Sequence, residues 1–171
     1  DASFAKYYGF SKEKCVQAIQ YYREYYLTKG IYENQVYDGM EELLKWLRDT
    51  GRRAIVATSK PEPSAIHVLE YFHMDSYFDI IAGATMDGSR VEKSDVIRYA
   101  LDRAGIRDLS GVVMVGDREN DIQGAKANGL DSIGVLYGYG SREELEEAGA
   151  MQIAETVEDL RGCIGQPARK E

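Results

Sequence analysis

With 171 residues, 44% of them hydrophobic, the chain is long enough for one domain, or for one domain with a small appendage. Its net charge of −8 argues against a nucleic acid polymer as partner, because a phosphate backbone requires a basic surface. No apolar run reaches the roughly 20 residues that a membrane span needs, and no signal-peptide pattern opens the chain. Cys15 and Cys163 have neither a metal-binding nor a CxxC spacing. We expect a cytoplasmic protein with two free thiols and no membrane partner.

The first 33 residues are rich in tyrosine and charge, and they differ from the rest of the chain. Ser11 is typical of an N-cap, and the helix that it opens is predicted to run to about Lys29 and to stop at Gly30. We interpret its tyrosines as a face that packs against another helix. The sequence thus predicts two parts, residues 1–33 and residues 34–171.

From Asp38 onward, helical patterns alternate with short apolar runs. We predict strands at 53–58, 78–82, 111–115 and 132–136, and a short edge strand at 151–153. The predicted helices span 39–49, 62–71, 94–104, 121–128, 141–148 and 156–163. Apolar residues on both faces of strands that alternate with helices indicate a parallel sheet covered on both sides. The predicted fold class is therefore α/β with a doubly wound parallel sheet.

Ligands of such sheets bind beyond the carboxyl ends of the strands, so the polar residues there are candidates for a site. Thr58 and Ser59 follow the first predicted strand, where a hydroxyl and the next backbone N–H groups can bind an anion. A simple helix cap is the alternative. Lys93 follows a glycine-containing loop and precedes a helix, where its ammonium could balance a phosphoryl group. Taken alone, it would be a surface lysine.

Two carboxylates follow the third predicted strand. Asp117 comes directly after Gly116, and Asp121 opens the next helix about one turn later. Oxygen ligands of this kind suit Mg²⁺, which uses few protein carboxylates and keeps several waters. Helix capping by Asp121 is the alternative, but it leaves the Gly116-Asp117 pair unexplained. The sequence therefore predicts a Mg²⁺ site with Asp117 and Asp121 as ligands.

In the order hydroxyl, lysine, acid pair, these elements resemble the haloacid dehalogenase superfamily, in particular its helical-cap branch around phosphoglycolate phosphatases and nucleotidases. Residues 56–61 (VATSKP) resemble the family's second motif, whose hydroxyl holds the phosphoryl group. Lys93 stands where the third motif has its lysine, and residues 115–121 (VGDREND) resemble the acidic fourth motif that binds Mg²⁺. The resemblance implies a Rossmann-like core at 34–171, preceded by the C-terminal part of a helical cap at 1–33.

The resemblance also implies a function. It suggests a Mg²⁺-dependent phosphatase that hydrolyses small phosphorylated metabolites, phosphoglycolate-like or nucleotide-like, through an aspartyl-phosphate. Thr58 and Lys93 would be catalytic, and together with Ser59 they would bind the phosphate. Asp117 would bind the metal, while Asp121 would hold a metal-bound water or orient Lys93.

The family's first motif, an Asp-x-Asp-Gly-Thr turn with the nucleophile and the general acid, is not found. Asp1-Ala2-Ser3 has no preceding strand and no second Asp. In 85–89 (TMDGS), Thr85 would occupy the place of the nucleophile, where a carboxylate is needed, so we interpret 86–90 as a loop leading to Lys93.

The missing motif has a structural consequence. The central strand that carries it would be absent, so the strands ending at Thr58 and Val115 would have unpaired edges or would pair with each other. We expect the natural protein to be longer. Alternatively, another chain or a swapped copy complements the sheet, which would make the protein self-associate.

Other functions remain open at this point. The absent first motif would also fit a catalytically silent phosphate-binding or regulatory fragment, and a phosphomutase could use the same core. A receiver domain shares the sheet type, but its acidic residues come before its threonine and lysine, whereas here the order is Thr58, Lys93, Asp117.

Overall fold

The computed structural model describes residues 4–5 and 8–165, so Asp1-Ala2-Ser3 and the last residues of the chain lie outside the described part. The chain divides into two compact units, with the boundary between Gln35 and Val36. The assignment of the first unit to a helical cap stays a prediction. None of the described helices combines the length and the apolar character needed to span a membrane.

The first unit consists mainly of one helix, α2 (Lys12–Thr28), followed by a short 3₁₀ turn, η1 (Gly30–Tyr32). Its N-cap is Ser11 as predicted, with the hydroxyl accepting a hydrogen bond from the Lys14 amide at 3.4 Å. Half or more of the surface of Tyr21, Tyr22 and Tyr25 is exposed. Since α2 is the main described helix of the first unit, the packing of these tyrosines against another helix stays a prediction.

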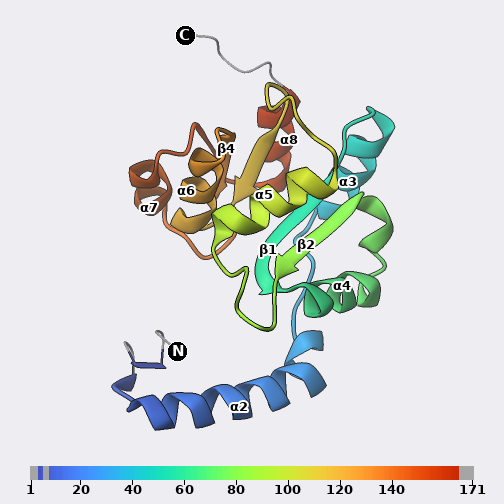
Figure 1. The fold of residues 1–171 in the computed structure, drawn as a ribbon. Coiled ribbons are helices and arrows are strands. Elements are labelled where there is room, and N and C mark those ends of the chain that lie inside the picture. Colours follow the sequence, from blue (N-terminus) through green and yellow to red (C-terminus); the bar gives the residue numbers. More distant parts are fainter. Residues whose placement is uncertain (1–3, 6–7, 166–171) are drawn as a thin grey trace. The chain divides into compact units, whose positions relative to one another are not determined.

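The second unit alternates strands and helices (Figure 1). Its strands are β1 (Ile55–Pro61), β2 (Ile80–Ala84), β3 (Val113–Gly116), β4 (Asp131–Val135) and β5 (Gln152–Ala154). Its helices are α3 (Met40–Asp49), α4 (Glu62–Tyr71), α5 (Lys93–Arg103), α6 (Glu119–Ala127), α7 (Arg142–Ala148) and α8 (Val157–Gly165), with a 3₁₀ turn η2 (Asp75–Tyr77). The predicted elements are all present, with ends that differ from the prediction by at most three residues. The largest difference is at β1, which continues past Thr58 because Pro61 pairs with Ala84 beyond an irregularity in the ladder.

All strand pairs are parallel, as predicted, but they form two sheets. One contains β1 and β2, and the other has the order β3-β4-β5. Within the described residues, β1 and β3 pair neither with each other nor with a strand between them. Of the two alternatives for these strands, unpaired edges are thus the one observed.

Helix α5 packs against the β1–β2 sheet and against α6, which in turn covers the β3-β4-β5 sheet. Val96 and Ala100 are buried against the β1–β2 sheet, whereas Ile97 belongs to a cluster that contains Ala57 of β1 and Met114 of β3. A separate cluster joins α3 and α8 to the β3-β4-β5 sheet, and the partly buried Trp46 packs against it. Helices therefore cover the strands in the doubly wound manner that the sequence predicts.

Shortening the side chain of Ile97, which lies in α5 and is 2% exposed, tests this packing. We expect Ile97→Ala to lower the free energy of unfolding by about 2–5 kcal/mol, because the loss of this buried side chain leaves a cavity in a cluster to which both sheets contribute. Arg98→Ala, on the exposed side of the same helix, should change it by less than about 1 kcal/mol. Urea unfolding measures both, and equal effects of the two variants would contradict the packing described.

Candidate functional site

Lys93 connects the carboxyl ends of the two sheets. It is the first residue of α5, and its Nζ donates to the carbonyl oxygen of Ala57 in β1 at 3.0 Å. The same ammonium pairs with Oδ1 of Asp121 in α6 at 2.8 Å. Both side chains are nearly buried, at 12% and 8% exposure. The charge of Lys93 is therefore fixed in the gap between β1 and β3, and it is not a freely moving surface lysine.

Asp121 organises the turn that follows β3. Its Oδ2 accepts hydrogen bonds from the backbone N–H groups of Asp117 and Arg118, both at 3.1 Å. A Cβ on Gly116 would lie 2.2 Å from the Asp121 Cβ, so the turn leaves no room for a side chain there. Asp121 thus orders the start of α6 and also holds Lys93. This close approach explains the glycine at position 116.

Asp117 has one engaged and one available carboxylate oxygen. Oδ2 accepts a hydrogen bond from the Tyr139 amide at 2.8 Å. Oδ1 has no hydrogen bond to any part of the chain that the structure describes. The side chain is only partly buried, so this oxygen can take a cation or a water.

Two tyrosines near Asp117, Tyr37 and Tyr137, have raised pKa values. Burial, followed by Tyr37 and Asp117, raises the pKa of Tyr137 to about 12. Burial, followed by Tyr139 and Asp117, also raises the pKa of Tyr37, whose ring packs edge-on against Tyr137 at 5.1 Å between centroids. Both phenols are therefore neutral at physiological pH.

The two candidate hydroxyl residues, Thr58 and Ser59, lie in β1 directly after Ala57, whose carbonyl oxygen accepts from Lys93. Thr58 follows Ala57 directly and is partly buried, and its Oγ1 accepts a hydrogen bond from the Lys60 amide at 3.2 Å. Ser59 is exposed. In the described part of the chain, neither hydroxyl bonds to Lys93, Asp117 or Asp121. The structure thus brings Lys93, Asp117 and Asp121 into one network and places Thr58 at its border.

The loop before α5 does not belong to this network. Asp87 accepts hydrogen bonds from the Ser89 amide at 3.0 Å and from the Ser89 hydroxyl at 2.8 Å. The hydrogen bond from the Ser89 amide, followed by the side chains of Thr85 and Ser89, lowers the pKa of Asp87 to about 2. Its carboxylate closes its own turn, which agrees with our interpretation of 86–90 as a loop leading to Lys93.

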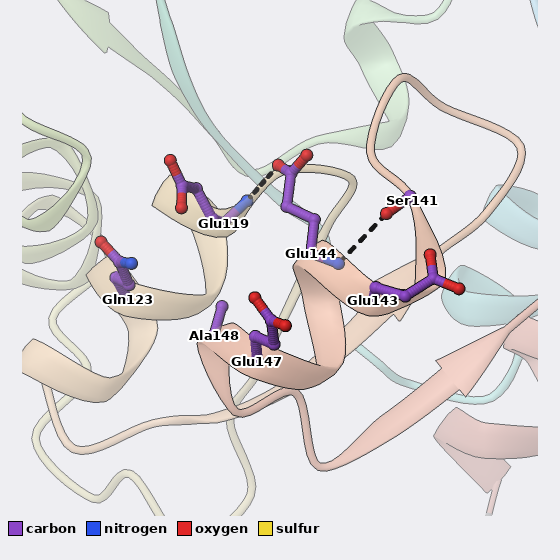
Figure 2. A pocket seen from close by; sticks show the side chains of 7 residues that line it. All are labelled: Glu119, Gln123, Ser141, Glu143, Glu144, Glu147 and Ala148. Atoms are coloured by element: carbon purple, nitrogen blue, oxygen red, sulfur yellow. Dashed lines mark hydrogen bonds between the residues drawn. The ribbon is translucent and has the colours of Figure 1, made fainter.

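Sequence reasoning missed Glu144. Its Oε1 accepts from Arg118 Nε at 2.7 Å. It also accepts from the Glu119 amide at 2.9 Å, which joins α7 to the start of α6 (Figure 2). The contact raises the pKa of Arg118 and lowers that of Glu144. A pocket beside it is lined by Glu119, Gln123, Ser141, Glu143, Glu144, Glu147 and Ala148. Its excess of carboxylates makes it unsuitable for a phosphate, and no spacing signal in the sequence marks it.

The donor set fits Mg²⁺ only as part of a site. Among the described residues, no three His, Cys, Asp or Glu side chains cluster in a way that could hold a metal. Mg²⁺, however, is often bound by one or two carboxylates together with waters and substrate phosphate, and Asp117 supplies one such oxygen. Both oxygens of Asp121 are engaged by Lys93 and by the backbone, so its direct role as a ligand stays a prediction.

Comparison with known proteins shows the family. The family model for haloacid dehalogenase-like hydrolases matches residues 2–135. The chain therefore belongs to the haloacid dehalogenase-like hydrolase family, as the motifs predicted. A crystal structure of a predicted phosphatase from Clostridium acetobutylicum, 48% identical, superposes with a TM-score of 0.89 over 95% of this chain and 75% of that one.

Similar curated proteins carry different activities in their names. A 5′-nucleotidase of Pseudomonas aeruginosa is 42% identical over 83% of this chain and 64% of its own length. Tyrosine-protein kinase PtkA of Mycobacterium tuberculosis is 41% identical over 90% of this chain and 53% of its own. Phosphoglycolate phosphatase 1 of Pseudomonas aeruginosa is 28% identical over 94% and 58%. The chain thus spans only about half to two thirds of the length of these relatives.

A double-mutant cycle tests the Lys93–Asp121 pair. Lys93→Met leaves a nearly buried carboxylate without its cation, and we expect the variant to unfold more easily by about 3–5 kcal/mol. Adding Asp121→Asn removes the charge, so the double variant should lose less than the sum of the two single losses. Denaturant titration of the four proteins measures the coupling, and additivity to within about 0.5 kcal/mol would refute the pair.

Proposed function

We propose that the protein is a Mg²⁺-dependent phosphatase that acts on small phosphate monoesters. The observation that carries this proposal is the hydrogen-bonded network of Lys93, Asp121 and Asp117 at the carboxyl ends of β1 and β3. It places a fixed cation and an available carboxylate oxygen where α/β sheets bind their ligands. Membership of the hydrolase family supports the same reaction class.

Each residue of the network has a role in this proposal. Lys93 balances the negative charge of the phosphoryl oxygens, and Asp121 orients Lys93. The hydroxyl of Thr58, assisted by Ser59, binds a phosphoryl oxygen beside the Ala57 carbonyl that holds Lys93. Asp117 holds Mg²⁺, which when bound neutralises charge that develops on the phosphoryl group. Asp121, the second acid of the pair, would act on the metal through a water, because both of its oxygens are engaged by Lys93 and by the backbone.

The attacking group would be an aspartate of the family's first motif, which we do not find in these 171 residues. It would attack the phosphorus and displace the alcohol of the ester, and water would then hydrolyse the aspartyl-phosphate and release inorganic phosphate. The unpaired edges of β1 and β3 are where a strand carrying that aspartate would insert. An N-terminal segment of the same protein is the simplest source of the strand, and a second copy of the chain is the alternative.

The class of substrate is a small phosphorylated metabolite. The names of the similar proteins include a nucleotidase and a phosphoglycolate phosphatase, so both kinds of ester are candidates, and a phosphomutase of the same family is a further one. Both cysteines are free, which suits a reducing compartment, and we place the protein in the cytoplasm.

A catalytically silent phosphate-binding or regulatory fragment is the second candidate. The missing first motif and the open edge between the two sheets favour it. The two candidates differ in a single outcome, namely whether supplying the aspartate-bearing strand produces turnover.

The decisive experiment uses an extended chain, defined as this sequence preceded by an Asp-x-Asp-Gly-Thr strand from its own gene or from a relative. We expect it to release phosphate from nucleoside monophosphates or phosphoglycolate only when Mg²⁺ is present, and EDTA should stop the reaction. Phosphate release over a panel of phosphorylated metabolites measures this. Absence of turnover across the panel, in a folded protein, would favour the silent fragment.

Variants of the extended chain test the individual roles. Asp117→Asn should abolish hydrolysis, because the metal loses its charged ligand. Asp131→Asn is the matched control, since Asp131 is exposed at the opposite end of β4, and it should retain full activity. Lys93→Met and Thr58→Val should lower kcat by about 10²–10³, the usual effect of removing one group that stabilises a transition state. Full activity of Asp117→Asn would refute the metal role of Asp117.

A further inference from the structure

The loop after β4 surrounds Asp117 on two sides. Gly138 and Gly140 both approach it so closely that an added Cβ would lie 2.3 Å from the Asp117 Cβ and 2.1 Å from the Asp117 carbonyl oxygen, respectively. Between them, the Tyr139 amide donates to Asp117 Oδ2 at 2.8 Å. Three consecutive residues thus contact the side chain and the backbone of a single carboxylate residue.

Gly138 and Gly140 are needed because there is no room for a side chain at these positions, and not because the backbone adopts an unusual conformation there. Gly149 and Gly129 have positive φ, and a Cβ on either would meet nothing within 4 Å, as is usual for glycines that end helices. Gly138 and Gly140 show the opposite combination, with no positive φ and no free volume. A residue with a side chain could adopt their backbone but would displace Asp117.

The far end of the loop is anchored to the residues that follow Asp117. Ser141 caps α7 by accepting from the Glu144 amide at 3.1 Å, and Glu144 in turn accepts from the Glu119 amide (Figure 2). Glu144 also pairs with Arg118. Asp121 holds the Asp117 amide from the other side. Asp117 is therefore fixed by hydrogen bonds at its amide and at one carboxylate oxygen, and Gly140 packs closely against its carbonyl oxygen.

We propose that Gly138-Tyr139-Gly140 is a positioning segment that occupies Oδ2 of Asp117 and leaves Oδ1 as the single oxygen offered to a divalent cation. This inference rests on the proposed metal role of Asp117 and deepens it. The segment acts through the close packing of its two glycines against Asp117 and through the backbone N–H of Tyr139. The phenol of Tyr139 is not needed for this role. Its effect is on the affinity for the cation, because a carboxylate fixed in place by outer contacts binds a metal more tightly than a mobile one.

The experiment is a Mn²⁺ titration of the extended chain, followed by electron paramagnetic resonance of the free ion, without substrate. We expect Gly138→Ala to weaken Mn²⁺ binding by about 10–100-fold, the usual effect of losing an outer contact of a metal ligand. Gly111→Ala is the matched control, because a Cβ there meets nothing within 4 Å and the φ is ordinary. It should bind Mn²⁺ as the unmodified protein does.

Asp117→Asn separates this inference from the proposed function. If Asp117→Asn binds Mn²⁺ as tightly as the unmodified protein, the metal role of Asp117 fails, and the positioning role fails with it. If Asp117→Asn weakens binding but folded Gly138→Ala does not, the metal role stands and the positioning segment is refuted.

Hydrogen exchange keeps the inference testable if Gly138→Ala does not fold. In the unmodified 171-residue chain, the Tyr139 amide should exchange slowly, and Asp117→Ala should accelerate it by about tenfold or more, because a bond to a carboxylate is lost. The Leu136 amide, which donates to the Ala154 carbonyl at 2.9 Å, is the internal control and should keep its rate. An unprotected Tyr139 amide, or one whose exchange is unchanged in Asp117→Ala, would overturn the proposal.

Discussion

The arrangement of this protein depends on one buried ammonium. Lys93 bonds the carbonyl of Ala57 on one sheet and the carboxylate of Asp121 beside the other, across a gap in which the described residues place no strand. A charge this deeply buried is stable only when it is paired and hydrogen-bonded, so the positions of β1, α5 and α6 are constrained together at this point. The same contacts form the candidate site, because they bring together Ala57, Lys93 and Asp121, which are far apart in the sequence.

The two acids of the site have different surroundings, although they are only four residues apart. Asp121 is 6% exposed and has both oxygens engaged, whereas Asp117 keeps one oxygen available. The first is suited to holding other groups in place, and the second to binding something from outside. The two carboxylates look equivalent in the sequence, but Asp121 is suited to ordering its neighbours and Asp117 is suited to binding a ligand.

Much of the fold was predictable because it depends on local patterns. The apolar run 53–58 and the capping residue Ser11 predict their elements from neighbouring residues alone, and the structure confirms both. The separation of the strands into two sheets was predictable in part, since the motif order indicated a missing central strand. Glu144 was not predictable, because its partners Arg118 and Glu119 are about 25 positions away and no regular spacing relates them.

The sequence by itself determined the class of fold, the family and the residue types at the ends of the strands, because periodicity, glycine positions and ordered motifs are written along the chain. Only the tertiary structure decided which groups touch. It showed Asp121 on Lys93, Asp87 closed in its own turn, and Asp117 enclosed by the loop after β4. The physical reason is that hydrogen bonds and ion pairs depend on distances of about 3 Å, and these are set by the packing of α5 and α6 against the strands rather than by any spacing in the sequence.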